Sequence, residues 1–197
     1  MNRTCRNCDQ LMPVFARTDA VYCSGACRTY AHRNPFPPEM VKLRRWIRYS
    51  SKKIPLTPDD GIASSTHPHT WSDFPWVAES TAGVGIGFVF NGDGIIGIDL
   101  DHAFNEDGNL KSWAGEIVDL FSHTYIEHSP SGTGLHIIAR GEVVEGRRWK
   151  FDDGGIEIYG SKRYFTMTGK RFEKTPKRLA NIGKIATVIS PLAEVMA

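Results

Sequence analysis

The chain of 197 residues lacks long apolar runs, and it has no cysteine after residue 27. No stretch approaches the ~18–20 apolar residues of a membrane span, so we expect no membrane partner. The N-terminus, MNRTCRNCDQ, has no apolar segment of the kind found in secretory signals, which favours a cytoplasmic protein. The chain also lacks the G-x-x-x-x-G-K-[ST] sequence, which excludes a P-loop motor.

Charge is small in total but unevenly spread. The net charge is +2, yet Lys and Arg exceed Asp and Glu by eleven to three in residues 1–53 and by eleven to five in residues 147–197. In residues 54–146 the balance reverses, with two basic residues against fourteen acidic ones. Basic flanks suit a polyanion such as nucleic acid, and an acidic centre suits a divalent cation. An ordinary solvated surface is the alternative interpretation.

All four cysteines lie near the N-terminus. Cys5 and Cys8 form C-x-x-C, and Cys23 and Cys27 form C-x-x-x-C after a gap of fourteen residues. Four thiolates suit a tetrahedral structural Zn²⁺, and the ion would supply folding energy that so short a unit lacks. A reduced metal-free cluster or a redox pair is the alternative. The sequence YCSGACRTYAHR resembles a treble-clef zinc finger, in which the second ligand pair opens a helix.

The chain divides by composition into a zinc module at residues 1–34, a proline-rich linker at 35–39, a main domain at 40–172 and a helical tail at 173–197. EMVKLRRWIRYSSKK is expected to be a basic helix. Three hairpins are expected, around NGDG, PSGTG and SKR. The segment GNLKSWAGEIVDLFSH is expected to be a helix that buries Trp113, Ile117, Leu120 and Phe121. The fold class is therefore α+β.

Two carboxylates end an apolar strand in GIIGIDLDHAF. Asp99 and Asp101 are two residues apart, so a strand places both on one face. Their mutual repulsion disappears if they bind a divalent metal, and oxygen ligands suit Mg²⁺ or Mn²⁺. Two solvated aspartates at an exposed strand end are the alternative for the pair alone.

Other residues support the metal hypothesis. SPSGTGLH is a small-residue loop that exposes N–H groups able to cradle phosphates, followed by His136 on the polar side of a strand. GGIEIYG places Glu157 between two isoleucines, and Lys162 and Arg163 follow it. Three acids and a histidine on one face, beside cations, indicate metal-assisted phosphoryl transfer with two ions. A structural role is the alternative for the histidine.

These motifs together resemble the archaeo-eukaryotic primase superfamily, in particular the primase–polymerase group of phages and plasmids. The resemblance covers roughly residues 40–170 and rests on IGIDLD, on GLH after SPSGT, and on IEIYG. It implies an RRM-like catalytic sheet joined to a small α/β unit. It also implies that the three acids bind metal and that His136 contacts the incoming nucleotide. The residues implied in the NTP or dNTP pocket are Ser129, Ser131, Gly132, Thr133, Gly134, His136, Arg163 and Tyr164.

In this interpretation the zinc module and the basic segment hold single-stranded DNA. Phosphate contacts are expected from Lys42, Arg44, Arg45, Arg48, Lys52 and Lys53. Trp46 and Tyr49 either stack on bases or belong to the core. Relatives often carry a helicase domain, so a replicative helicase on a separate chain or a missing domain is an expected partner.

Three functions compete on these observations. The leading one is a DNA primase and DNA polymerase that joins nucleotides on a DNA template. The second is a non-catalytic zinc-finger DNA-binding protein in replication or regulation, which the presence of all three acids and the histidine disfavours. The third is another metal-dependent nucleotidyl or glycosyl transferase, which leaves the cysteines and Glu157 unexplained.

Overall fold

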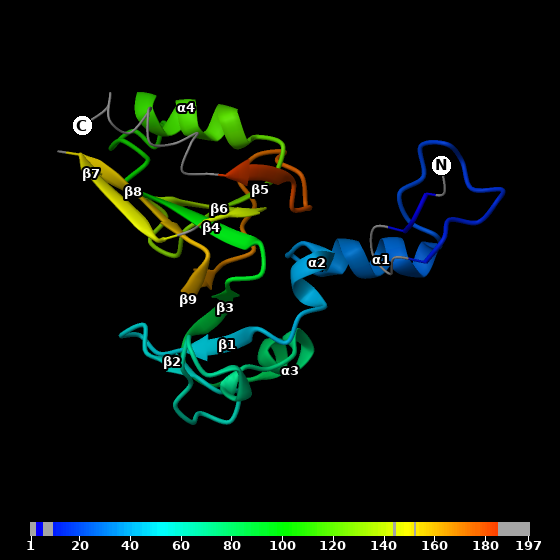
Figure 1. Ribbon diagram of the computed structural model, residues 1–197, viewed down its shortest axis with the longest axis horizontal. Helices are drawn as coiled ribbons and strands as arrows, with labels where there is room; N and C mark the ends of the chain where they lie inside the picture. The colour runs from blue at the N-terminus through cyan, green and yellow to red at the C-terminus, as the bar shows by residue number, and fades with distance from the viewer. Residues whose placement is uncertain (1–2, 6–9, 144, 152, 185–197) are drawn as a thin grey trace.

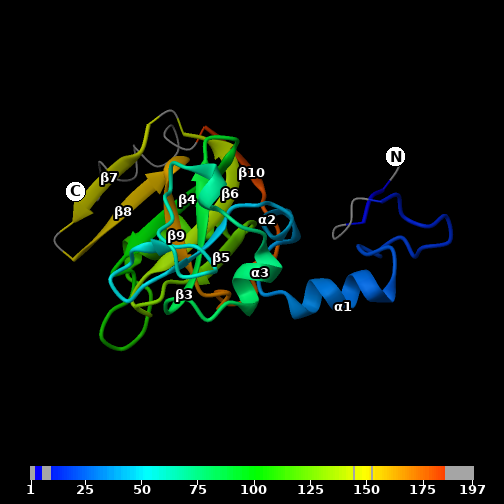
Figure 2. The same cartoon turned by 90° about the horizontal axis from the view of Figure 1, so that it is seen from below.

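The structure is a computed structural model that describes residues 3–5, 10–143, 145–151 and 153–184. In the described residues the body consists of two β-sheets that meet at a corner, with short helices around them (Figure 1). Helix α1 (Gly25–Arg33) and residues 10–24 before it project away from this body (Figure 2). The α+β class expected from the sequence is confirmed.

The smaller sheet has the order β2-β1-β3-β9, with all neighbours antiparallel. Its strands are β1 (Trp46–Tyr49), β2 (Pro55–Leu56), β3 (Gly85–Asn91) and β9 (Ser161–Met167). Helix α3 (Phe74–Glu79) and the short 3-10 helix η1 (Pro68–Thr70) flank it.

The larger sheet has the order β10-β6-β4-β8-β7, and β5 pairs with β6 beside this path. All of its neighbours are antiparallel except β10 and β6. Its strands are β4 (Ile95–Asp101), β5 (Tyr125–His128), β6 (Leu135–Glu142), β7 (Arg147–Phe151), β8 (Gly154–Tyr159) and β10 (Asn181–Lys184).

Of the three expected hairpins, the structure confirms one. Strands β5 and β6 pair around the PSGTG turn, with Tyr125 opposite Ile138. The other two expectations were wrong, because β3 and β4 pair with β9 and β8 instead of with each other. Gly92 and Gly94 have φ of +75° and +88°, and the Gly92 amide donates to the Gly160 carbonyl at 2.8 Å. The NGDG segment therefore connects the two sheets instead of closing a hairpin. Glycines with positive φ suit such a connection as well as a tight turn.

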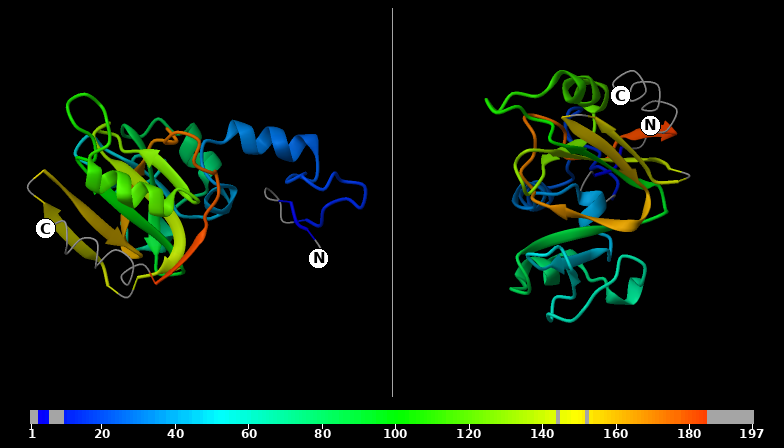
Figure 3. Two further views of the ribbon diagram at one scale, coloured as in Figure 1. Left: turned by 90° about the horizontal axis from the view of Figure 1, so that it is seen from above. Right: turned by 90° about the vertical axis from the view of Figure 1, so that its left-hand side faces the viewer.

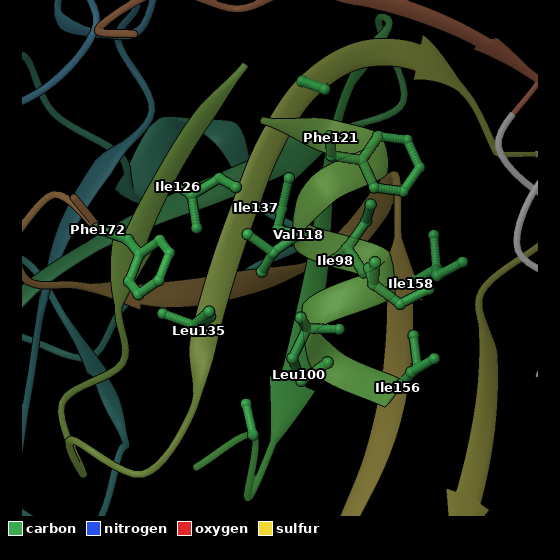
Figure 4. Packing of buried hydrophobic residues seen from close by; sticks show 14 of the residues in the cluster. Ile98, Leu100, Val118, Phe121, Ile126, Leu135, Ile137, Ile156, Ile158 and Phe172 are labelled. Atoms are coloured by element: carbon green, nitrogen blue, oxygen red, sulfur yellow. The ribbon is translucent and has the colours of Figure 1, made fainter. Parts of the chain in front are cut away.

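Helix α4 (Ser112–Phe121) covers one face of the larger sheet (Figures 3 and 4). Trp113, Ile117 and Phe121 are buried as expected, but Leu120 is 39% exposed and Val118 is buried in its place. Isoleucines and leucines of β4, β6 and β8 fill the space beneath the helix (Figure 4).

The basic helix expected over residues 39–53 is wrong. Helix α2 (Pro38–Val41) is only four residues long, and the chain then forms β1. Trp46 and Ile47 are both fully buried, in two core clusters on opposite faces of the strand. A strand covered on both faces has consecutive apolar residues. The apolar pattern of so short a run does not distinguish such a strand from a helix.

The expected tail helix is also wrong where the structure describes it, since residues 181–184 form β10. The rest of that tail, residues 185–197, lies outside the described residues. In the expected linker, Phe36 is 3% exposed and packs against Trp46 at a ring distance of 4.8 Å. The proposed domain boundaries themselves stay predictions.

Candidate active site

The three acids and the histidine expected in the site lie together on one face of the larger sheet. Asp99 on β4 is the direct cross-strand partner of His136 on β6 and of Glu157 on β8. Cross-strand partners point to the same face, and Asp101 joins them two residues along β4. The three strands therefore bring the acids and the histidine together, on the face opposite to α4.

Asp99 carries the clearest electrostatic signature. Its pKa is raised from 3.8 to about 6, chiefly by burial and to a lesser degree by the charges of Asp101 and Glu157. The neighbouring His136, with Nε2 at 3.7 Å from Asp99 Oδ1, lowers this pKa, and Lys53 lowers it to a lesser degree. Burial beside two other carboxyls disfavours the ionised form of Asp99, and a divalent cation bound there would relieve this.

Glu157 has cationic and neutral partners of its own. Arg148 on β7 is its cross-strand partner, and their Nε–Oε1 distance is 2.6 Å. The Tyr159 hydroxyl donates to Glu157 Oε2 at 2.9 Å. Arg163 lies over the Tyr159 ring at 5.0 Å, so this cation reaches the border of the acidic face from β9. Arg148 and Tyr159 were not anticipated from the sequence.

Behind His136 lies Glu127, another residue that the sequence reasoning missed. Glu127 is fully buried, and its Oε1 lies 3.4 Å from His136 Nδ1. The two residues face each other across the β5–β6 hairpin. That hairpin was expected, and its register places Glu127 opposite His136. The alternation in YIEHS was therefore a signal from which this pair could have been predicted.

The small-residue loop connects β5 to β6 beside the acids. Its hydroxyls form a chain, with Ser129 Oγ 3.0 Å from Ser131 Oγ and Ser131 Oγ 3.0 Å from Thr133 Oγ1. Gly132 adopts a φ of +76°, which favours glycine. A Cβ at Gly134 would lie 2.6 Å from the Leu100 carbonyl oxygen, so the loop approaches β4 where Asp99 and Asp101 lie.

Tyr164 does not share a face with Arg163. It packs against the core cluster that contains Ile47 and Val89, on the opposite side of β9 from Phe165. Its hydroxyl donates to the Lys53 carbonyl, and burial raises its pKa to about 12. This contact fixes the β1–β2 turn that carries Lys53.

The basic segment divides into exposed and buried residues. Lys42, Arg44, Lys52 and Lys53 are exposed, as expected of phosphate contacts. The expectation for Arg45 was wrong, because this residue is 6% exposed and ion-paired with Asp93. Arg48 is partly buried and donates to the Ala82 carbonyl at 2.6 Å.

Base stacking by the two aromatic residues of β1 is also excluded in this conformation. Trp46 is fully buried and donates from Nε1 to the Met40 carbonyl at 3.1 Å. Tyr49 is 9% exposed and packs beside Tyr164 at a ring distance of 6.4 Å. The alternative interpretation, that both residues belong to the core, is confirmed.

Cys5, Cys23 and Cys27 gather near the N-terminus, with their sulfur atoms all within 4.8 Å of one another. Cys8 lies outside the described residues. Ser24 caps α1 by accepting from the Cys27 amide at 3.1 Å, so the second cysteine pair does open a helix. In the described part of the chain, this is the one group of three or more His, Cys, Asp or Glu ligand atoms so closely gathered. The acids of the sheet are spread more widely.

The donor sets nonetheless fit two different metals. Three sulfur atoms around one point fit a soft tetrahedral ion, and Asp99, Asp101 and Glu157 offer hard oxygen atoms from adjacent strands.

No helix among the described residues is both long and apolar enough to cross a membrane.

Comparison with known proteins adds an independent observation. No family model matches the chain. The chain is 39% identical over 140 residues to a DNA primase-polymerase of Nitratiruptor phage NrS-1. The match covers 65% of this chain but 19% of the phage protein, so the chain spans about a fifth of that relative. The similarity supports the resemblance to the primase–polymerase group.

Proposed function

We propose that the protein is a DNA primase and DNA polymerase of phage or plasmid replication, which synthesises primers on a single-stranded DNA template. The observation that carries the proposal is the row of Asp99, Asp101 and Glu157 beside His136 on one sheet face. The similarity to a phage DNA primase-polymerase supports the same function. The β6-β4-β8 arrangement, backed by α4, is compatible with the RRM-like catalytic sheet that the resemblance implies.

The role proposed for each residue rests on the resemblance and is supported by its position. Asp99, Asp101 and Glu157 would hold two Mg²⁺ or Mn²⁺ ions. When bound, such ions lower the pKa of a 3′-hydroxyl and neutralise charge on the α-phosphate and the leaving pyrophosphate. His136, which lies beside Asp99, donates to a phosphate of the incoming NTP or dNTP. The Ser129–Gly134 loop and Arg163 bind and orient the remaining phosphates, which positions the α-phosphate for in-line attack.

Template binding is assigned to the exposed part of the basic segment and to the zinc module. Lys42, Arg44, Lys52 and Lys53 offer phosphate contacts, and their contribution should weaken with added salt. Lys53 also acts electrostatically on Asp99, so the β1–β2 turn lies close enough to link template binding with the acidic face.

Primer synthesis on single-stranded DNA tests the proposed activity. The assay supplies labelled NTPs or dNTPs with Mg²⁺ or Mn²⁺ and compares wild type with Asp99→Ala/Asp101→Ala. Asp107→Ala is the matched control, since Asp107 is an exposed acid outside the row. Products from wild type and the control, but not from the double variant, are expected. Absence of product from wild type, even with a preformed primer, would favour a non-catalytic DNA-binding protein.

The cysteine cluster is proposed to bind one structural Zn²⁺ through Cys5, Cys8, Cys23 and Cys27. Because a unit of this size has little apolar core, removal of the ion should unfold it while the sheets persist. Metal analysis of the purified protein should give about one Zn²⁺ per chain. A Cys23→Ser variant that retains a full equivalent of zinc would refute the assignment.

A further inference from the structure

We infer that Glu127 is the positioning residue for His136, which it holds with Nδ1 protonated and Nε2 directed at the phosphates of the incoming nucleotide. The role in nucleotide binding rests on the proposed function. The arrangement of the two side chains does not, because it follows from contacts within the structure.

Glu127 is fully buried, which is unusual for an acidic residue. A carboxylate so placed needs donors for its lone pairs, because burial without partners is costly. The backbone amides of Thr168 and Gly169 donate to it at 3.0 and 2.9 Å, and the Tyr125 hydroxyl donates at 2.8 Å. Burial, together with the charge of Glu127, raises the pKa of Tyr125, so its hydroxyl keeps the proton that it donates.

These donors decide which nitrogen of His136 carries hydrogen. The Thr168 amide and His136 Nδ1 both approach Oε1, while the Gly169 amide and the Tyr125 hydroxyl approach Oε2. Since Glu127 already accepts from two backbone amides, it acts as an acceptor toward the ring as well. Nδ1 must therefore be the donor in that contact.

The rest of the surroundings fixes the ring in the same orientation. Phe165 packs against the imidazole at 4.9 Å between ring centroids. Nε2, on the far side of the ring, lies 3.7 Å from Asp99 Oδ1. Nε2 is thus the atom presented to the acidic face, as a free acceptor when the ring is neutral and as a donor when it is protonated. Only the doubly protonated ring can donate from Nε2 to a phosphate, and Nδ1 donates to Glu127 in that form as well.

Glu127 also ties this histidine to the end of β9. Thr168 and Gly169 follow that strand directly, and Thr168 Oγ1 donates to the His128 carbonyl at 2.6 Å. The carboxylate therefore connects β5, β6 and the segment after β9, so that the smaller sheet helps to set the position of His136. Such outer contacts commonly determine the precision of a binding residue.

The tautomer of His136 in the wild-type protein is the first test. Long-range ¹H–¹⁵N correlation spectra of histidine-labelled protein, assigned with His136→Ala, report which ring nitrogen is protonated. We expect the Nδ1–H form in the neutral ring, although the neutral imidazole of a free histidine prefers Nε2–H. An Nε2–H form would overturn the inference, whether or not the protein synthesises DNA.

A double-mutant cycle is the second test. Glu127→Gln keeps the volume but turns an NH₂ group toward two existing donors, so it should raise the KM for the nucleotide about tenfold, with a smaller change in kcat. In the His136→Ala background the same substitution should have no further effect on KM. An equal loss in both backgrounds would refute a role that acts through His136.

Thr175→Val supplies the matched control. Thr175 is a buried donor to the carbonyls of Phe172 and of Ile126, and Ile126 is the neighbour of Glu127 in β5. The Thr175→Val substitution should lower the melting temperature while leaving the KM for the nucleotide and the tautomer of His136 unchanged. If wild type yields no product, the proposed activity fails, and the spectra still decide the role of Glu127. If Glu127→Gln does not fold, the wild-type tautomer remains decisive.

Discussion

On the face of β4 that carries Ile98 and Leu100, the neighbouring side chains are apolar and buried, whereas the face that carries Asp99 and Asp101 holds carboxylates and a histidine. Both faces belong to the same seven residues. The apolar face, covered by α4, contributes favourable burial. On the polar face, burial and the neighbouring carboxylates together raise the pKa of Asp99 to about 6. The comparison indicates that one face supplies the stability that allows the other to be strained electrostatically for function.

Truncation on the apolar face should have the largest effect on stability. Leu100 is fully buried beneath α4 (Figure 4), so Leu100→Ala should lower the free energy of unfolding by about 2–5 kcal/mol. Urea denaturation at fixed pH measures the change. A loss below 1 kcal/mol would mean that this face is packed less tightly than the structure indicates.

A substitution on the polar face should have the opposite sign. Because the folded-state pKa of Asp99 exceeds 3.8, its contribution to stability is present below about pH 4 and is lost as the pH rises through about 6. Asn carries no charge, so Asp99→Asn should stabilise the metal-free protein at pH 8 by up to about 3 kcal/mol, at 1.36 kcal/mol per pKa unit. Denaturation in EDTA at pH 8 and pH 4 checks this.

The two proteins should differ much less at pH 4, where the Asp99 carboxyl is protonated in the folded state and only about half ionised in the unfolded state. A variant that is less stable than wild type at pH 8 would show that Asp99 is held by favourable contacts instead of by strain.

The smallest effect is expected at the edge of the polar face. Arg148 pairs with Glu157, but its side chain is 54% exposed, so Arg148→Ala should change stability by less than about 1 kcal/mol. The same substitution removes a cation that competes for the Glu157 carboxylate, so Mn²⁺ should bind a few-fold more tightly. Denaturation and Mn²⁺ titration measure the two effects. Weaker Mn²⁺ binding would instead make Arg148 a support for the metal-bound carboxylate.

Local alternation in the sequence predicted this two-faced character well. IGIDLD, GLHII and GIEIY each place polar and apolar residues on opposite sides, and the strands pair as that pattern requires. The β5–β6 hairpin and the helix over residues 112–121 were also predicted, because turn residues and a helical apolar spacing act locally.

The failures have a common physical origin in long-range pairing. NGDG favours a tight turn, yet β3 and β4 gain more by pairing with β9 and β8, which lie far away in sequence. In the same way, Trp46 and Ile47 form a strand because two clusters from distant segments cover its faces. Glu127 was missed because its role depends on Thr168 and Gly169, which no local pattern connects with it.

Binding of Mn²⁺ to the acidic face tests the central claim most directly. Paramagnetic resonance of free Mn²⁺, titrated with zinc-loaded wild type and with Asp101→Ala, counts ions held by the sheet. We expect wild type to bind Mn²⁺ and Asp101→Ala to lose that binding while keeping the wild-type melting temperature. Equal Mn²⁺ binding by the two proteins would contradict the assignment of Asp99, Asp101 and Glu157 as the metal site.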